Sequence, residues 1–334
     1  MFDVSSALDH LYSMNPIRVE LEITEVCNLR CLFCYNDAER KIPTLKEVKI
    51  LIDRLSEQGV LELVLTGGEP MSHPDFDEIV LYAVLKIPCV MVQTNGTLMS
   101  ASRARMLKNG GVAGVNISLH GNKHDHTILT QITGAYDSAV SGIKNCISQN
   151  LTLWVNSVLT NVNDVGLVEH LKWLFDIGVR NFTFTRFTPI GQLAQKDLLL
   201  SSQRLIELLR DIVSFGRTNG ASILLANAFP LCGLSSDLKH LSEVCTYGLT
   251  KFYVDVNGDV LYCGMSRVRL GNILESSFEE IKRSSDVFHK NVNSKLAPEK
   301  CMSCPSYPLK CRGGCRAAAI ANQRTICGED PFSE

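Results

Sequence analysis

The chain has 334 residues, of which 45% are hydrophobic and 20% are charged, and its formal net charge is −2 at pH 7. This composition is ordinary for a globular protein, and the length suits one large α/β domain with a small appendage. A nearly neutral chain without long runs of like charge argues against nucleic acid or an anionic membrane surface as a partner.

Residues 1–17 precede any predicted strand and form an N-terminal extension. They contain neither a basic start nor a continuous apolar segment, so they do not resemble a signal peptide. The apolar stretch 79–92 is interrupted by Lys86 and Pro88, so we expect no membrane-spanning helix. Thirteen cysteines in such a chain indicate metal binding or redox chemistry in a reducing cytoplasm rather than disulfides.

From residue 18 to about 190, short apolar runs alternate with amphipathic helical patterns. Leu45, Val48, Ile52 and Leu55, for example, recur at helical spacing. Strands interleaved with helices in this way predict parallel βαβ units. The predicted strands are 18–24, 61–66, 89–94, 114–119, 152–158 and 180–186. The predicted helices are 44–58, 74–85, 100–109, 135–149, 163–177 and 201–219.

Three cysteines follow the first predicted strand at short spacing. Cys27, Cys31 and Cys34 form the pattern Cys-x3-Cys-x2-Cys. Three thiolates on one short loop can hold three corners of a cubane 4Fe–4S cluster, which leaves the fourth iron without a protein ligand and open to chemistry. Parallel α/β folds also place their active sites at the carboxyl ends of strands. A zinc site or scattered core thiols are the simpler alternatives.

This triplet and its position resemble the radical SAM superfamily. The resemblance implies an α/β fold, a TIM-like partial (β/α)6 barrel, which we expect over residues 18–230. It also implies that the open iron binds S-adenosylmethionine (SAM), whose reductive cleavage yields a 5′-deoxyadenosyl radical. The aromatic residues beside the third cysteine, Phe33 and Tyr35, are expected near the cofactors.

The resemblance further implies SAM contacts at the ends of the later strands. Residues 66–70 read Thr-Gly-Gly-Glu-Pro, and the two glycines allow close approach to the backbone. Some family members have arginine where this chain has Thr130, so the SAM carboxylate needs another partner, for which Arg186 is a candidate. Without the resemblance these segments are ordinary turns and helix caps. The implied SAM-binding residues are Gly67, Gly68, Glu69, Pro70, Gln93, Asn95, Ser118, Asn156 and Arg186.

A histidine group follows the fourth predicted strand. His120, His124 and His126 could bind a mononuclear metal, but no carboxylate–histidine helix pattern frames them, and we expect a polar loop at the barrel mouth. Cys89 and Cys146 fall within a strand and a helix pattern, so they are predicted to be core thiols.

After about residue 230 the pattern changes to a cysteine-rich tail. Residues 252–256 and 260–262 predict a β-hairpin with an Asn257-Gly258 turn. The remaining tail has too little apolar periodicity to bury a core of its own, which is typical of segments held by metals or disulfides. The tail contains Cys245, Cys263, Cys301, Cys304, Cys311, Cys315 and Cys327.

The tail resembles the SPASM extension of radical SAM enzymes, with one extra residue between Cys304 and Cys311, and we expect this domain over 231–334. The resemblance implies two auxiliary 4Fe–4S clusters, three clusters in all. For the fourth ligand of the first auxiliary cluster, Cys232 is a candidate; otherwise Cys232 is a plain thiol and the position is open to substrate or solvent. A structural zinc ribbon is the alternative for the whole tail. The implied ligands are Cys245, Cys263 and Cys315 for the first auxiliary cluster and Cys301, Cys304, Cys311 and Cys327 for the second.

The resemblance implies a radical SAM oxidoreductase whose auxiliary clusters assist oxidation of the substrate. Gly264 follows Cys263 where sulfatase maturases have an acidic residue, so that branch is disfavoured. We expect a cross-link or other oxidised bond in a ribosomally made precursor peptide. The expected partners are a flavodoxin- or ferredoxin-type electron donor and a separate leader-binding protein. The alternatives are radical modification of a tetrapyrrole, sugar or aminoglycoside, and a non-catalytic metal-binding scaffold.

Overall fold

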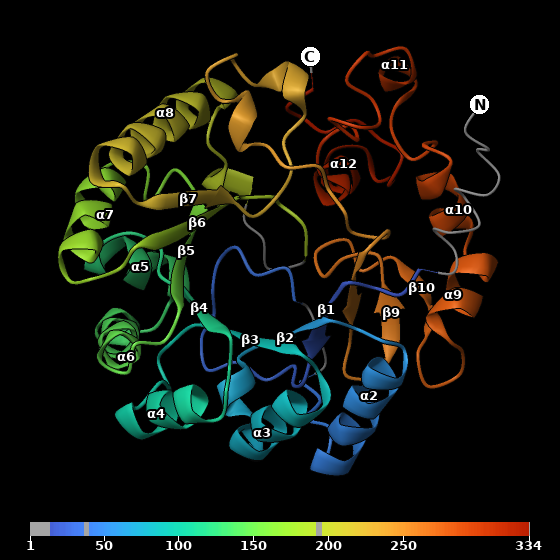
Figure 1. Cartoon of the computed structure of the whole chain (residues 1–334). Helices are drawn as coiled ribbons and strands as arrows, with labels where there is room; N and C mark the ends of the chain where they lie inside the picture. The colour runs from blue at the N-terminus through green and yellow to red at the C-terminus, as the bar shows by residue number, and fades with distance from the viewer. Residues whose placement is uncertain (1–13, 37–39, 192–195, 334) are drawn as a thin grey trace.

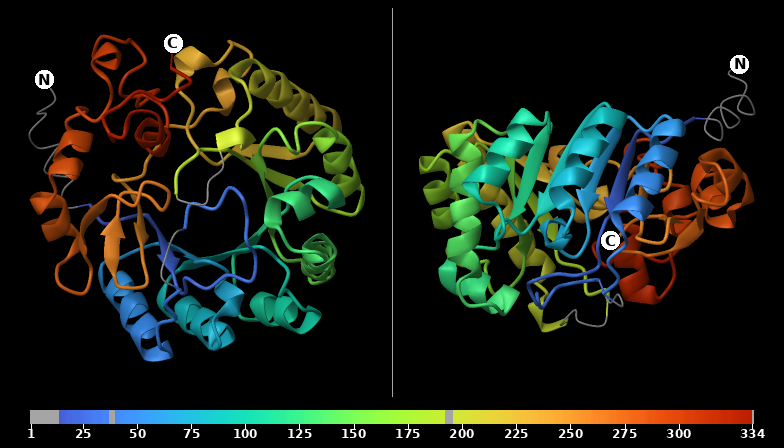
Figure 2. Two further views of the ribbon diagram at one scale, coloured as in Figure 1. Left: turned by 180° about the vertical axis from the view of Figure 1, so that it is seen from behind. Right: turned by 90° about the horizontal axis from the view of Figure 1, so that it is seen from below.

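A single curved sheet with helices on its outer side organises the molecule (Figure 1). The computed structural model describes residues 14–36, 40–191 and 196–333, so most of the predicted N-terminal extension lies outside the described residues. The described part of the loop between the first strand and the first long helix lies inside the ring of strands and helices in the left view of Figure 2 and at one end of the barrel in the right view. Within the described segments, no helix is both long and apolar enough to cross a membrane.

The sheet has ten strands in the order β10-β9-β8-β1-β2-β3-β4-β5-β6-β7, and β1 to β7 run parallel. All six predicted barrel strands are confirmed to within two residues, and the barrel is open, as expected. The seventh parallel strand was not predicted, because its four residues follow a helix directly and show no clear alternation of polar and apolar side chains. These strands are β1 (Arg18–Glu22), β2 (Glu62–Thr66), β3 (Cys89–Thr94), β4 (Gly114–Ser118), β5 (Leu153–Leu159), β6 (Asn181–Arg186) and β7 (Ser222–Leu225).

The predicted helices are confirmed on the outer side of the sheet. In the first of these helices the sequence itself favours the fold: Thr44 and Glu47 form a capping box at its N-terminus, and the apolar side chains along one face are buried. One short helix, α5, was missed. These helices are α2 (Leu45–Glu57), α3 (Phe76–Lys86), α4 (Ala101–Asn109), α5 (Lys123–Thr130), α6 (Ala135–Ser148), α7 (Leu167–Asp176) and α8 (Ser202–Asn219). Short 3-10 turns are η1 (Pro70–Ser72), η2 (Lys196–Leu198), η3 (Leu231–Gly233) and η4 (Lys239–Leu241).

The tail extends the barrel sheet. Its first strand pairs in parallel with β1, and the predicted hairpin is confirmed, with Gly258 at φ +81° in the turn. The sheet is therefore continuous between the two expected domains, whose boundary stays a prediction. The tail contains β8 (Lys251–Val254), β9 (Asp259–Leu261), β10 (Arg269–Asn272), α9 (Phe278–Ser284), α10 (Asp286–Val292), α11 (Glu299–Met302) and α12 (Arg316–Gln323).

The two halves of the tail differ in how they are buried. Phe252, Phe278 and Phe288 are buried in the same hydrophobic core as the barrel, so residues 251–296 share that core. Among the described residues 297–333 the buried hydrophobic side chains are only alanines and Cys315. The expectation that the tail cannot build its own core therefore fits residues 297–333 and does not fit the segment before them.

Candidate active site

The loop that carries the first three cysteines is held by backbone hydrogen bonds to the barrel. The Arg30 N–H donates to the Thr130 carbonyl at 3.1 Å, and the Leu32 N–H donates to the Leu129 carbonyl at 2.9 Å. Thr130 therefore ends α5 under the loop, and its hydroxyl donates to the His126 carbonyl at 2.7 Å. The missed helix is thus part of the support for the cysteine loop.

The glycines after β2 bring a second loop against the cysteine loop. The Gly68 N–H donates to the Thr24 carbonyl and the Glu69 N–H donates to the Val26 carbonyl, both at 2.8 Å. A Cβ on Gly68 would lie 2.6 Å from the Val26 carbonyl oxygen, so only glycine fits there. The glycines therefore allow the backbone of the cysteine loop to approach closely, and their predicted contact with SAM stays a prediction.

Glu69 connects the ends of β2 and β3. Its buried carboxylate accepts hydrogen bonds from the Thr94 hydroxyl at 2.6 Å and from the backbone N–H groups of Met71 at 3.1 Å and Asn95 at 2.7 Å. Burial raises the pKa of this carboxyl, and the Thr94 hydrogen bond opposes the rise. The Asn95 side chain donates to Asn28 in the cysteine loop at 2.8 Å. Glu69 and Asn95 therefore position the loop through contacts with protein groups.

The three thiols of the loop lie within electrostatic range of one another. The Leu29 N–H donates to the Cys27 sulfur at 3.4 Å, and burial raises the pKa of Cys27 to about 11. Burial also raises the pKa of Cys31, and Cys27 and Cys34 raise it further. A cubane cluster places each cysteine on a different iron, so its thiolates are farther apart than those around one ion. Among the described residues, no three Cys, His, Asp or Glu side chains converge on a single-ion site.

The histidines form packed structure rather than the polar loop that we expected. His120 and His126 are buried with ring centroids 5.5 Å apart, and Phe33 packs edge-on against His120 at 4.6 Å. The Nδ1 atom of His126 accepts the His120 N–H at 3.1 Å, and burial lowers the pKa of His126 to about 4. His124 is exposed on α5. The expectation was wrong because Asn122 caps a helix at this point, accepting the N–H groups of residues 124 and 125.

Of the two cysteines predicted to be core thiols, Cys146 is buried in α6, as expected. Cys89 is only half-buried, because it begins β3 at the edge of the core.

Polar side chains line the concave face of the parallel strands. Gln93, Ser118 and Asn156 lie on this face, and the Asn156 side chain accepts the Thr185 hydroxyl at 3.0 Å. Ser118 and Asn156 are direct neighbours in register. These three predicted residues are therefore gathered in one lumen beside the cysteine loop.

The same lumen contains buried polar atoms that the sequence did not single out. Asn116 Oδ1 and Thr183 Oγ1 have no hydrogen-bond partner among the described residues, whereas Glu22 Oε2 forms an ion pair with Arg267 Nη1 at 3.5 Å. Buried polar atoms are normally paired, so the Asn116 and Thr183 oxygens suit a polar ligand in the lumen. Their signal in the sequence is a polar residue at every second position of an apolar strand.

Tyr35 joins the cysteine loop to the tail. Burial raises its pKa most, and both Cys34 and Cys263 are among the groups that raise it further. A Cβ on Gly264 would lie 2.8 Å from the Tyr253 ring and 3.3 Å from the Tyr35 hydroxyl. Glycine at position 264 therefore leaves room for this pair of tyrosines.

The tail cysteines form two groups. Burial raises the pKa of Cys263 to about 12, and Cys315 and Cys245 raise it further, so the three implied ligands of the first auxiliary cluster are neighbours. Burial also raises the pKa of Cys301, and the neighbouring thiols of Cys311, Cys232 and Cys304 raise it further. Cys232 thus lies near the second group, whereas the sequence made it a candidate for the first. Cys327 is half-buried in the loop after α12.

Arg186 is not part of the polar lumen. It shares strand parity with the buried Phe182 and Phe184, and its guanidinium pairs with Asp330 at 2.7 Å. The side chain is therefore occupied in the tail, away from the SAM contact expected for it.

Comparison with known families gives two matches. Residues 21–174 match the radical SAM superfamily, and residues 245–305 match an iron–sulfur cluster-binding domain, the SPASM domain. The first contains the cysteine loop and strands β2 to β5, and the second contains the hairpin and four of the tail cysteines.

Individual relatives cover nearly the whole chain. The AdoMet-dependent heme synthase of Methanosarcina barkeri is 25% identical over 95% of this chain and 96% of its own length. The mycofactocin maturase MftC of Mycobacterium tuberculosis is 28% identical over 95% of this chain and 82% of its own. The crystal structure of Streptococcus suis SuiB bound to precursor peptide SuiA superimposes with a TM-score of 0.77, at 18% identity, over 99% of this chain and 79% of SuiB. The last likeness shows the fold alone.

Proposed function

Because this chain belongs to the radical SAM superfamily and carries a SPASM domain, we propose that it is an oxidoreductase that modifies a ribosomally made peptide. Membership of the superfamily implies 4Fe–4S clusters and SAM binding. The mycofactocin maturase, at 28% identity, and SuiB, solved with its precursor peptide, support a peptide as the substrate class. The proposed product is a peptide with a cross-link or another oxidised bond.

The observation that carries the proposal is the position of the cysteine loop. It follows β1 and is held by backbone hydrogen bonds to the end of β2 and to α5, so the three thiols are fixed at the mouth of a polar lumen. We assign Cys27, Cys31 and Cys34 to the cluster that binds SAM. When bound, these cofactors supply a 5′-deoxyadenosyl radical that removes a hydrogen atom from the substrate.

The chain's own residues bind and orient SAM in this proposal. The unpaired Asn116 and Thr183 side-chain oxygens, with Gln93, Ser118 and Asn156, offer polar contacts along one wall of the lumen. Phe33 and Leu32 anchor the cysteine loop in an apolar cluster with Leu129, Val158 and Phe187. Gly67, Gly68, Glu69, Pro70 and Asn95 keep the neighbouring loops in place, while Tyr35 closes the side of the lumen that faces the tail.

Three clusters are proposed in all. Cys245, Cys263 and Cys315 hold the first auxiliary cluster, and Cys301, Cys304, Cys311 and Cys327 hold the second. Because Cys232 is near Cys301, we propose it as a neighbour of the second cluster and leave the fourth corner of the first open to substrate or solvent. A flavodoxin- or ferredoxin-type protein in the cytoplasm would supply electrons, and a separate protein would bind the peptide leader.

A tetrapyrrole is the second candidate substrate, because the heme synthase of Methanosarcina barkeri aligns over nearly all of both chains. One experiment distinguishes the two. The protein is reconstituted anaerobically with iron and sulfide and incubated with SAM and dithionite, with either a precursor peptide encoded beside it or an iron-containing porphyrin precursor. We expect the peptide to lose two hydrogens by mass spectrometry. A mass change only in the tetrapyrrole would replace the peptide proposal, and no 5′-deoxyadenosine with either would contradict both.

A further inference from the structure

Arg186 and Asp330 form a buried ion pair that connects the barrel to the end of the tail. Arg186 Nη1 donates to Asp330 Oδ1 at 2.9 Å and Nη2 donates to Oδ2 at 2.7 Å. The two side chains are 5% and 0% exposed. Such two-armed pairing fixes both the distance and the plane of the guanidinium. Removing one partner would leave the other charge buried and uncompensated.

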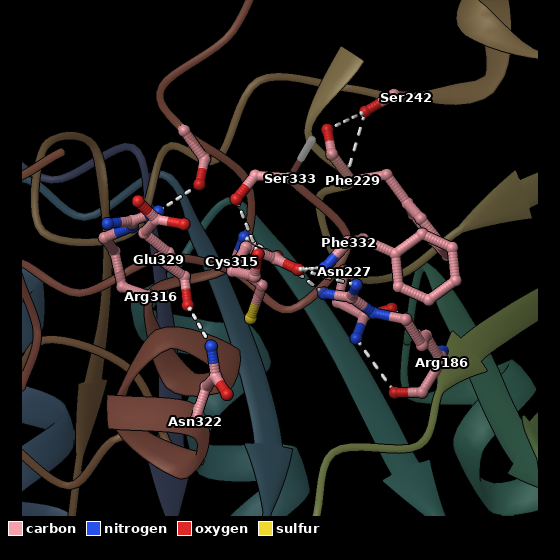
Figure 3. A network of polar contacts seen from close by, with 12 residues as sticks. Arg186, Asn227, Phe229, Ser242, Cys315, Arg316, Asn322, Glu329, Phe332 and Ser333 are labelled. Carbon is pink, nitrogen blue, oxygen red and sulfur yellow. Dashed lines mark hydrogen bonds and ion pairs between the residues drawn. The ribbon is translucent and has the colours of Figure 1, made fainter. Parts of the chain in front are cut away.

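The guanidinium is also fixed by its surroundings, as Figure 3 shows. It lies over the rings of Phe229 at 4.6 Å and Phe332 at 5.1 Å, and these two rings meet edge to face. The Asn227 side chain accepts the backbone N–H of Arg186 and donates to the backbone carbonyl of Arg186, both at 2.9 Å. Arg186 therefore has one orientation, set by residues of the barrel and of the C-terminal segment.

Asp330 connects this pair to a cysteine. Its Oδ2 atom accepts the Cys315 N–H at 2.8 Å, and Cys315 is the N-cap residue of α12. Gly314 permits the approach, since its φ is +80° and a Cβ there would lie 2.5 Å from the same oxygen. The backbone before α12 is thus shaped around the Asp330 carboxylate, which sets the position of the Cys315 sulfur.

The guanidinium is joined to Cys315 through a single carboxylate oxygen. Asp330 Oδ2, which accepts from Arg186 Nη2 at 2.7 Å, is the same atom that accepts the Cys315 N–H at 2.8 Å. Arg186 Nε is buried and has no hydrogen-bond partner in the described part of the chain. One donor of a buried cation is therefore available beside a thiol that already sits at a helix N-terminus.

We propose that Arg186 and Asp330 form a positioning pair that fixes Cys315 for the first auxiliary cluster and places a positive charge beside its sulfur, which raises the reduction potential of that cluster. This inference rests on the proposed function, since it takes Cys315 as a cluster ligand. A reduced cluster carries one more negative charge than an oxidised one, so a nearby cation stabilises the reduced state. Hydrogen bonds to the ligand sulfurs act in the same direction.

The test uses four variants of the full chain, reconstituted anaerobically. Arg186→Met removes the charge, Arg186→Lys keeps it without the two-armed geometry, and Asp330→Asn removes the opposing carboxylate. Arg204→Met is the matched control, because Arg204 of α8 forms an ion pair with Asp164 at 2.6 Å that involves no tail residue. For each variant, iron per chain is measured and the clusters are titrated by electron paramagnetic resonance.

For Arg186→Met we expect the equilibrium constant for one-electron reduction of one auxiliary cluster to fall by about tenfold, which corresponds to about 59 mV. Asp330→Asn shifts the same cluster in the opposite direction, Arg186→Lys restores most of the wild-type potential, and Arg204→Met changes none. A pair with a purely structural role would not give shifts of opposite sign.

Wild-type potentials in Arg186→Met and Asp330→Asn, with full iron content, would overturn the inference. If Arg186→Met does not retain its iron, Asp330→Asn decides: a raised potential supports the inference, and an unchanged or lowered one overturns it. Failure of the proposed function has a different signature, since the wild-type protein would then produce no 5′-deoxyadenosine whatever its potentials.

Discussion

The two cysteine-bearing regions of this molecule are held in different ways. The loop with Cys27, Cys31 and Cys34 is fixed by backbone hydrogen bonds to the end of β2 and to α5. Residues 297–333, which carry most of the tail cysteines, bury only alanines and Cys315 among their hydrophobic side chains. They are held instead by polar contacts such as Arg316, whose Nη1 donates to the carbonyls of Leu296, Ile326 and Gly328.

This difference indicates where the energy of cluster binding goes. Backbone hydrogen bonds hold the first site in place, so we expect cluster binding there to change the fold little. If residues 297–333 hold the proposed second auxiliary cluster, its metal–thiolate bonds replace a missing core, and cluster binding is also folding energy. Arg186 connects the barrel to the tail, since its backbone lies in a barrel strand and its side chain pairs with Asp330 in the tail.

The largest expected effect separates SAM cleavage from substrate oxidation. Cys304→Ala removes an exposed proposed ligand of the second auxiliary cluster. We expect formation of oxidised product to fall by about 100-fold or more, while 5′-deoxyadenosine continues to form, because the cysteine loop is independent of this segment. Liquid chromatography with mass spectrometry measures both products. Cys89→Ala, on a half-buried barrel thiol, is the control, and equal loss of both products in Cys304→Ala would contradict the separation.

Removing iron tests the same contrast without a mutation. After anaerobic chelation of iron from the loaded protein, limited proteolysis should cut first within residues 297–333, since they have little buried apolar area to hold them. The cysteine loop and the barrel strands should resist for longer. Mass spectrometry of the fragments locates the cuts. Early cleavage within the cysteine loop, with residues 297–333 still protected, would reverse the proposed assignment of stability.

Glu22 gives the stability of the barrel a pH dependence. Burial raises its pKa from 4.5 to about 7, against the effect of Arg267 and with the further effect of Glu25 and Asp255. Between these two values the folded state binds the proton more tightly than the unfolded state. The free energy of unfolding therefore falls by about 3 kcal/mol as the pH rises through this window.

Glu22→Gln removes this group's titration and should be more stable than the wild type at pH 8 but not at pH 5. Urea unfolding curves of both proteins at the two pH values measure the difference. A constant difference between variant and wild type would show that Glu22 does not titrate in this range.

A smaller effect is expected where the two loops touch. Gly68→Ala places a methyl group 2.6 Å from the Val26 carbonyl oxygen and should cost about 2 kcal/mol of stability. Iron uptake at the cysteine loop should fall with it. Gly220→Ala is the comparison: its φ is +69°, but nothing lies within 4 Å of the added carbon, so it costs only the backbone strain, about 1 kcal/mol. Equal iron uptake in the two variants would show that the contact does not position the loop.

The sequence was sufficient to predict the barrel strands and the outer helices, because alternation and helical spacing report which face is buried. In the barrel it did not predict α5 or β7, each too short to show a clear period, and α5 supports the cysteine loop. In the tail it did not predict β10 or the short helices α9 to α12. The sequence predicts the strand that carries Arg186, and the alternation of Arg186 with Phe182 and Phe184 along this strand turns its side chain out of the lumen. Its partner Asp330 is 144 residues away in sequence, a distance over which no local pattern operates.

Cleavage of SAM by the wild type and by Cys31→Ala tests the central claim most directly. Both proteins are purified and reconstituted anaerobically, their iron and zinc are counted, and 5′-deoxyadenosine is measured after addition of SAM and dithionite. The account predicts 5′-deoxyadenosine from the wild type, none from Cys31→Ala, and about four fewer iron atoms per chain in the variant. Zinc in place of iron at this loop, or undiminished cleavage by Cys31→Ala, would contradict it.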